Sequence, residues 1–134
     1  MTAYLTDTNH VSRLLDPGHP FRVWFLEQVS AGDTFSLIVP LITETVFGFS
    51  ILPRASRNWI EWQEVRPSLL LLPLDEKDAL NAANLQVLLR RQGRQLATVD
   101  SLIAAVALRN DLTLLTTDGD FAAVPSLLSE NRVT

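Results

Sequence analysis

Four carboxylates stand where folded elements are expected to meet: Asp7, Glu44, Asp100 and Asp118. If they converge, they repel one another and resist ionising together, and a divalent cation removes that conflict. The chain has no cysteine and only two histidines, so an all-oxygen site would favour Mg²⁺ or Mn²⁺. Such an ion binds phosphate oxygens and lowers the pKa of a bound water. The pattern therefore predicts metal-dependent phosphoryl transfer or hydrolysis.

Strands and helices alternate along the chain in a way that would bring these acids together. Buried strands are expected at residues 4–5, 34–39, 69–72 and 113–115, with an edge strand at 132–134. The segment 96–99 leads to Asp100. The run 69–72 is apolar throughout, as in an interior parallel strand. Helices are expected over residues 8–15, 21–31, 40–52, 54–65, 75–92 and 100–108. Such alternation is typical of a parallel sheet with helices on both faces. Acids that follow its strands share the edge where open α/β sheets bind ligands.

Two of the four acids also have a purely structural interpretation. Asp7 could be only a turn or cap residue, although Thr8 or Asn9 is also suited to cap the helix that follows. Asp100 could cap its own helix. Neither interpretation explains why acids recur at equivalent places in the predicted fold.

Glu44 is expected on an otherwise apolar helical face. Phe47, Gly48 and Ile51 follow it at offsets of three, four and seven residues. A carboxylate on a core-facing stripe is costly unless it is paired or metal-bound. Gly48 would let another backbone approach closely there. The prediction is that Glu44 is buried beside the other acids.

Length and composition limit the class of protein. The 134 residues, 47% hydrophobic, suit one domain covering residues 1–134. No apolar run reaches the roughly 18–20 residues that span a membrane, and the N-terminus lacks the basic residues of a signal peptide. A cytoplasmic protein is expected, and the absence of cysteine fits a reducing compartment. The net charge of −4 gives no overall attraction for nucleic acid. Attraction for nucleic acid would have to come from local arginines near the crevice: Arg13, Arg54, Arg57 and Arg94. The alternative is that these arginines form surface ion pairs.

The chain resembles the PIN-domain family through four acidic segments: LTDTNHVSRLL, ITETVFGFSIL, TVDSLIAAVALRNDL and LLTTDGDF. Their order and spacing are similar to those of the VapC-type toxins of bacterial toxin–antitoxin pairs. The resemblance implies a three-layer α/β/α sandwich around a parallel sheet, and an endoribonuclease in which metal-activated water attacks an RNA phosphodiester. It also implies a cognate antitoxin, a homodimer within the toxin–antitoxin complex, and contact with operator DNA only through the antitoxin.

The resemblance assigns metal binding and catalysis to Asp7, Glu44, Asp100 and Asp118, which would hold one or two Mg²⁺ or Mn²⁺ ions. It assigns supporting positions around these acids to Thr8, Asn9, Ser101, Thr116 and Asp120. Asp118 is expected to be the primary acid of its segment, with Asp120 capping the next helix.

Two residues depart from the family pattern. Thr45 follows Glu44 where the family often has leucine, and His10 stands where an aliphatic residue is common. His10 is expected on a solvated helix face, not as a ligand.

The third and fourth helices are the expected surface for the antitoxin, because bulky apolar and arginine side chains crowd them: Phe47, Phe49, Ile51, Arg54, Arg57, Trp59 and Trp62. An aromatic anchor with an arginine rim is typical of an interface hot spot. The two tryptophans could equally belong to the core.

Two other functions compete with the nuclease. An aspartate-based phosphatase needs a second Asp two residues after the first, where this chain has Asn9, and a positioned lysine, whereas Lys77 lies in a different kind of place. A non-catalytic module that only pairs with a partner protein would use the tryptophan helix.

Overall fold

The computed structural model describes residues 1–134 and has a sheet of five parallel strands at its centre. The strands are β1 (Ala3–Thr6), β2 (Thr34–Ile38), β3 (Leu70–Leu72), β4 (Thr113–Leu115) and β5 (Ser129–Glu130), in the spatial order β3-β2-β1-β4-β5. The central strand β1 pairs with β2 on one side and with β4 on the other. Parallel strands need crossover connections, and the helices supply them.

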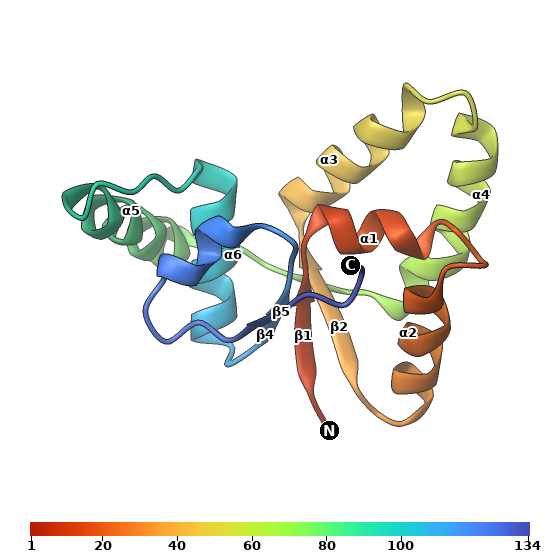
Figure 1. The fold of residues 1–134 in the computed structure, drawn as a ribbon, viewed down its shortest axis with the longest axis horizontal. Helices are drawn as coiled ribbons and strands as arrows, with labels where there is room; N and C mark the ends of the chain where they lie inside the picture. Colours follow the sequence, from red (N-terminus) through yellow and green to blue (C-terminus); the bar gives the residue numbers. More distant parts are fainter.

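Helices lie on both sides of the sheet, which confirms the predicted three-layer sandwich (Figure 1). One side holds α1 (Thr8–Leu14), α2 (Pro20–Ser30), α3 (Val39–Ser50) and α4 (Ala55–Val65). The other side holds α5 (Glu76–Arg91) and α6 (Thr98–Arg109). Two 3₁₀ turns, η1 (Arg66–Ser68) and η2 (Gly119–Ala123), complete the chain. None of the helices combines the length and the apolar character needed to cross a membrane.

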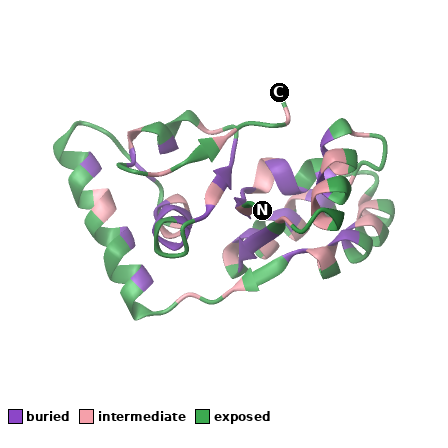
Figure 2. Cartoon of the chain, turned by 90° about the horizontal axis from the view of Figure 1, so that it is seen from below, coloured by how far each residue is buried: buried purple, intermediate pink, exposed green.

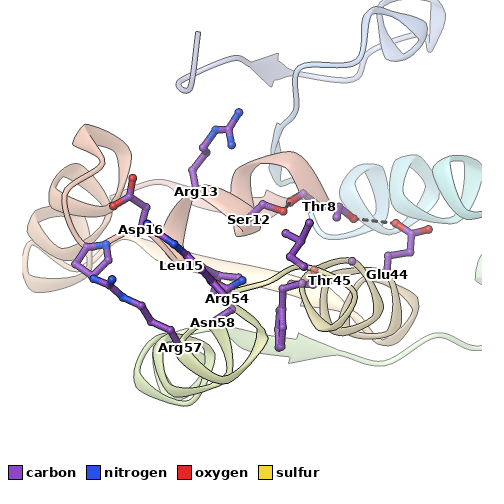
Figure 3. Close-up of a pocket in the computed structure, with 14 residues that line it drawn as sticks. Thr8, Ser12, Arg13, Leu15, Asp16, Glu44, Thr45, Arg54, Arg57 and Asn58 are labelled. Atoms are coloured by element: carbon purple, nitrogen blue, oxygen red, sulfur yellow. Dashed lines mark hydrogen bonds between the residues drawn. The ribbon is translucent and has the colours of Figure 1, made fainter.

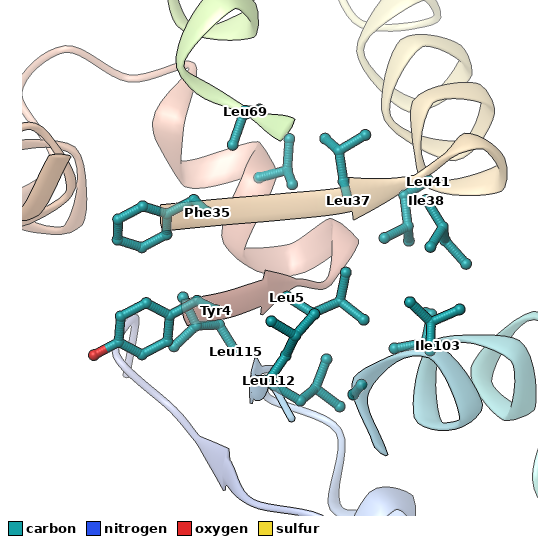
Figure 4. Close-up of a cluster of buried hydrophobic side chains, with 14 of the residues drawn as sticks. Tyr4, Leu5, Phe35, Leu37, Ile38, Leu41, Leu69, Ile103, Leu112 and Leu115 are labelled. Carbon is teal, nitrogen blue, oxygen red and sulfur yellow. The ribbon is translucent and has the colours of Figure 1, made fainter. Parts of the chain in front are cut away.

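The core is built mainly from the central strands and the helices that cover them. Leu5 of β1, Leu37 of β2 and Leu114 of β4 are fully buried. Figure 4 shows Ile103 of α6 approaching the side chains of β1 and β2. Tyr4 stacks on a ring of β2 with centroids 5.0 Å apart. This packing fixes the carboxyl ends of β2, β1 and β4 side by side in that order.

The long helix α5 packs along α6 and leaves most of its surface exposed (Figure 2). Its buried positions form one stripe: Asp78, Ala82 and Leu89. The helix begins with a capping box between Asp75 and Asp78. Just beyond its end, Gly93 has a φ of +74°, the left-handed conformation that glycine adopts most readily. Both ends agree with the prediction of a helix over residues 75–92.

Two expected strands differ from the structure, and the segment before Asp100 is not a strand. The apolar run 69–72 forms β3 at an edge of the sheet, with Leu70 and Leu71 exposed by 51% and 43%, because no further strand covers it. Residues 96 and 97 form no strand, since only Leu96 is buried there and α6 already begins at Thr98. The last strand is β5 at Ser129–Glu130 rather than 132–134, because the final residues turn back onto α1.

Candidate active site

Asp7 lies at the carboxyl end of the central strand and is only 7% exposed. Its backbone N–H donates to the carbonyl of Leu115 (2.9 Å), which holds it against β4. Its Oδ1 accepts a hydrogen bond from the Thr8 N–H (2.8 Å), and its Oδ2 accepts one from Thr116 Oγ1 (2.7 Å). Of the three candidates, Asp7 rather than Thr8 or Asn9 therefore caps α1, and it still keeps its carboxylate at the sheet edge.

Asp118 follows β4 and shares a partner with Asp7. Its N–H donates to Thr116 Oγ1 (3.0 Å), so one threonine hydroxyl joins two of the acidic segments. Asp118 Oδ1 accepts from the Asp120 N–H (2.9 Å) and caps η2. The prediction that Asp120 caps this helix is wrong: its side chain is exposed and makes no hydrogen bond.

Glu44 is exposed rather than buried. The buried stripe of α3 runs through Leu41, Thr45 and Phe49, at offsets of four residues, and turns Glu44 toward the open edge of the sheet. There the Glu44 carboxylate accepts a hydrogen bond from Thr8 Oγ1 (2.8 Å; Figure 3). The expected close approach at Gly48 is also absent, because a Cβ added to Gly48 would meet no atom within 4 Å.

Asp100 is the third residue of α6 and does not cap it, because the cap position is Ala97 and no side-chain bond is made there. The buried alanines that follow on the same helix, Ala104, Ala105 and Ala107, allow close packing there. Ser101 donates to the carbonyl of Thr98 (2.7 Å) and has no bond to an acid. Its supporting role beside the acids stays a prediction.

Asn9 and His10 connect the acidic edge to the C-terminal segment. Asn9 Oδ1 accepts from the Thr117 N–H (3.3 Å) and lies 2.9 Å from His10 Nδ1. His10 Nε2 accepts from the Arg132 N–H (3.1 Å), so the hydrogen-bond network assigns the proton to Nδ1. His10 is completely buried, not solvated as expected. Burial, with a smaller contribution from Arg13, lowers the pKa of His10 to about 4, which keeps the ring neutral.

Burial and neighbouring carboxylates raise the pKa values of Asp100 and Asp7. For Asp100, burial is the main cause of a pKa raised to about 6, and negative charges add to it in the order Asp7, Asp118, Glu44 and Asp120. Burial also raises the pKa of Asp7; hydrogen bonds from Thr116 and Thr8 oppose the increase, and neighbouring acids add to it. The charges of the other predicted acids thus act on Asp7 and Asp100, although no three of the acids are close enough to hold a metal ion together in this structure.

Replacing Asp100 by Asn should raise the melting temperature of the metal-free protein at pH 7 but not at pH 4. The pKa of Asp100 rises from 3.8 to about 6 on folding, so the folded state binds more protons between these values, and stability falls as pH rises through this window. Because Asp100 is partly exposed, we expect the variant to gain only about 1 kcal/mol in free energy of unfolding at pH 7, which corresponds to a few degrees in melting temperature.

Thermal unfolding of both proteins in EDTA from pH 4 to pH 7 measures this effect. His10 has the opposite linkage, because its lowered pKa makes stability rise with pH. Because the variant and the wild type both contain His10, the difference between their melting temperatures at each pH does not include the His10 contribution. If the variant and the wild type differ in melting temperature by the same amount at pH 4 and at pH 7, the charge of Asp100 does not destabilise the folded protein.

The family model of the PIN domain matches residues 4–127. The sequence is 30% identical over 128 residues to the toxin FitB of Neisseria gonorrhoeae, covering 89% of this chain and 91% of that protein. The chain therefore belongs to the PIN-domain family, as its four acidic segments indicate.

Solved structures share the fold at low sequence identity. VapBC2 from Rickettsia felis, bound to a DNA fragment from its promoter, superposes with a TM-score of 0.84 at 21% identity, covering 98% of this chain and 99% of that chain. VapC20 from Mycobacterium tuberculosis, a toxin that cleaves the Sarcin-Ricin loop, gives a TM-score of 0.63 at 16% identity, covering 91% and 95%. At these identities the likeness concerns the fold.

Proposed function

We propose that this protein is the toxin of a toxin–antitoxin pair and acts in the cytoplasm as a metal-dependent endoribonuclease. The observation that carries the proposal is the row of acids along one sheet edge, where Asp100 has a pKa of about 6 because it is buried beside other carboxylates. Such mutual destabilisation is expected of a site prepared for a cation. Membership of the PIN-domain family and the relationship to a toxin support the same function.

The residues that would hold Mg²⁺ or Mn²⁺ are Asp7, Glu44, Asp100 and Asp118. Their donors are all carboxylate oxygens, which suits these ions, and a cation would relieve the repulsion that raises the pKa of Asp100. When bound, the ion supplies charge stabilisation at the phosphate and activation of water. Within the chain, Thr116 orients Asp7 and Thr8 orients Glu44 through their hydroxyl groups. Asn9 holds the loop after β4 through the Thr117 N–H.

Removal of divalent metal should abolish RNA cleavage, and adding Mg²⁺ or Mn²⁺ should restore it. The reason is that a bound cation would offset the repulsion between the carboxylates and the RNA phosphate and would activate water. The measurement is cleavage of a fluorescent RNA by purified protein before EDTA, after EDTA, and after each metal is returned. Full activity in excess EDTA would rule out the metal-dependent mechanism.

The arrangement of Asn9 weighs against an aspartate-based phosphatase. The second acid of that chemistry would stand at this position, but Asn9 Oδ1 is already engaged with Thr117 N–H and His10. No lysine lines the acidic edge, since Lys77 lies at the start of α5. Hydrolysis of p-nitrophenyl phosphate at a rate comparable with RNA cleavage would favour the phosphatase instead. Partner binding without cleavage of any RNA would favour the non-catalytic module.

The proposed antitoxin would cover α3 and α4. These helices and their connection expose a group of large apolar side chains: Phe47, Ile51, Leu52, Trp59 and Ile60. Arg54 and Arg57 lie beside them and are also exposed. Trp62 is only 5% exposed and belongs to the core, so it is not part of this surface. A homodimer, and contact with operator DNA only through the antitoxin, remain proposals that rest on the family resemblance.

Replacing Phe47 or Trp59 by Ala should weaken binding of the cognate antitoxin by about tenfold or more, because truncating an aromatic anchor typically costs at least 1–2 kcal/mol. Phe47 is 66% exposed, so Phe47→Ala should change stability little. Trp59 is 45% exposed and its ring lies 6.2 Å from that of Phe49, so Trp59→Ala should also lower the melting temperature. Leu80→Ala is the matched control, since Leu80 is 59% exposed but lies on α5. Isothermal titration against the purified antitoxin, with thermal unfolding alongside, measures both effects. Equal affinity losses in all three variants would exclude α3 and α4 as the specific surface.

A further inference from the structure

Two pockets lined by arginines flank the acidic edge, the edge of the sheet where Glu44, Asp7, Asp100, Asp118 and Asp120 lie. The first, about 400 Å³ in volume, includes Thr8 and Glu44 of the acidic edge together with Arg13, Arg54 and Arg57 (Figure 3). The second, about 370 Å³, includes Asp120 of that edge together with Arg90 and Arg94. Each pocket is therefore continuous with the acids but is formed by different helices.

The sheet order places the two pockets at opposite ends of the row of acids. Glu44 follows β2, Asp7 follows β1 and Asp118 follows β4, and these strands are neighbours in the order β2-β1-β4. The first pocket adjoins Glu44 at the β2 end. The second adjoins Asp120 beyond the β4 end, between α5 and the start of α6. A chain that crosses the acids in this direction would meet both pockets.

The five arginines of these pockets are free to bind an anion. Their side chains form no ion pair and no hydrogen bond in the structure, whereas Arg22, Arg109 and Arg132 are each paired with an acid. Asp16 also lines the first pocket, but its Oδ1 accepts a hydrogen bond from the Gly18 N–H (3.0 Å). In each pocket the arginines outnumber the acids by one.

A second observation marks the first pocket as built for a polar ligand. Thr45 lines it and is only 3% exposed, yet its hydroxyl group has no hydrogen-bond partner. A buried polar group without a partner is costly. The amide of Asn58 in this pocket and that of Gln95 in the other could bind base edges, whereas Gln86 Nε2 already donates to the carbonyl of Leu96 (3.0 Å).

We infer that the two pockets hold the RNA backbone on both sides of the cleaved bond, with Arg13, Arg54 and Arg57 on one flank and Arg90 and Arg94 on the other. The inference rests on the proposed ribonuclease function and specifies its substrate. Guanidinium groups bind phosphates in a bidentate manner, and the protein's net charge of −4 leaves local arginines to attract RNA. The site therefore requires nucleotides on both flanks, which makes cleavage internal to a strand.

The test compares R54Q/R57Q and R90Q/R94Q with the control Arg91→Gln. Arg91 is exposed on α5 next to Arg90 but lines neither pocket. All proteins carry Asp7→Asn so that the RNA stays intact. Binding is measured by the fluorescence anisotropy of a labelled, unstructured RNA of about 12 nucleotides in Mg²⁺. The NaCl concentration runs from about 50 to 200 mM, the range over which phosphate contacts lose much of their affinity.

Each double variant should weaken RNA binding by about tenfold and reduce the slope of log K against log[salt] by about 1.4, or 0.7 for each lost phosphate contact. Arg91→Gln should change the affinity by less than about twofold, as an arginine outside the RNA path contributes only to the overall field. Neither double variant should affect the weak binding of a trinucleotide, which is too short to reach the flanks.

An unchanged slope in either double variant would overturn the two-sided path, as would an equal effect from Arg91→Gln. If R54Q/R57Q keeps its RNA affinity but loses the antitoxin, the first pocket belongs to a protein partner and the inference fails. Binding is measured without cleavage, so the result is independent of the nuclease assay. A protein that binds RNA as described but cuts none would refute the proposed nuclease activity and leave the path intact.

Discussion

Replacing Asp7 by Asn should lower RNA cleavage by at least about a hundredfold while the protein stays folded. Loss of a residue that only supports a metal ligand typically costs 10- to 100-fold, and Asp7 is proposed as a direct ligand at the centre of the acidic row. The substitution also removes the negative oxygen that accepts from Thr116 Oγ1 (2.7 Å). Thr116 Oγ1 also accepts from the Asp118 N–H (3.0 Å), so the substitution removes the negative charge from the link between two acidic segments.

The stability of the Asp7→Asn protein should stay within about 1 kcal/mol of the wild type. The neutral side chain loses two charge-assisted hydrogen bonds but also loses the burial and repulsion that raise the pKa of Asp7, and these effects oppose each other. Cleavage is followed at equal protein concentration in Mg²⁺, with thermal unfolding as the folding control. Asp111→Asn is the matched substitution, since Asp111 is exposed, lies on the turn before β4, outside the acidic row, and lines neither arginine pocket. Cleavage by the Asp7 variant at the wild-type rate would disprove the mechanism.

The position of Asp7 and Asp118 at one sheet edge was predictable because it follows from topology alone. A short apolar run followed by an acid, repeated along an α/β pattern, places both acids at the carboxyl ends of parallel strands. The register of β1 with β4 then brings Thr6 opposite Leu115, one residue before Asp7 and three residues before Asp118. The three-layer fold was predictable for the same reason, since alternation of strands and helices leaves few other arrangements.

The orientation of Glu44 was not predictable from helical spacing. Two stripes of α3 carry apolar residues, one through Phe47 and Ile51 and the other through Leu41 and Phe49. The structure buries the second stripe, leaving Phe47 and Ile51 exposed by 66% and 69%. Local periodicity cannot choose between two apolar faces, because the choice depends on how α1 and α4 pack against the helix.

His10 was mispredicted because its partner is 122 residues away along the chain. The spacing of α1 gives no sign that Nε2 will meet the Arg132 N–H. The only indication in the sequence is that a histidine stands where the family commonly has an aliphatic, core-facing residue. Arg132 itself is held by Glu130 (2.8 Å) and lies over the Trp24 ring at 4.1 Å. Such long-range polar contacts appear only once the fold is known.

Asp78 is a further residue that sequence patterns did not reveal, and it anchors α5 to α6. Its side chain is fully buried, and Arg109 Nε and Nη2 donate to its two oxygens (2.6 and 2.9 Å). It also receives the Asp75 N–H (3.1 Å) in the capping box. Burial alone would raise the pKa of Asp78, but the hydrogen bonds from Arg109 and the Asp75 backbone outweigh it and hold the pKa below its ordinary value.

Asp78→Ala should destabilise the protein by about 2–3 kcal/mol, lowering the melting temperature by about 10 °C. The estimate combines about 1 kcal/mol for the cap with 1.5–3 kcal/mol for hydrogen bonds to a charged group, reduced because Arg109 is partly exposed and can reach water. Glu130→Ala is the control, since the Arg132–Glu130 pair is 38% and 40% exposed and such surface pairs contribute less than about 1 kcal/mol. Thermal unfolding in EDTA at pH 7 measures both variants.

Arg109→Ala separates the ion pair from the cap, because it leaves the buried Asp78 carboxylate without its guanidinium partner. In the wild type, the pKa of Asp78 is lower in the folded state than in the unfolded state. Ionised Asp78 therefore stabilises the folded protein fully at any pH above its unfolded-state pKa, and this stabilisation is lost as the pH falls through the folded-state pKa. In Arg109→Ala, burial should dominate and raise the pKa, so the variant should become more stable as pH falls toward 4. Unfolding curves from pH 7 to pH 4 test this reversal. If the stability difference between wild type and Arg109→Ala does not narrow as pH falls, Arg109 does not hold the Asp78 carboxylate in its charged form.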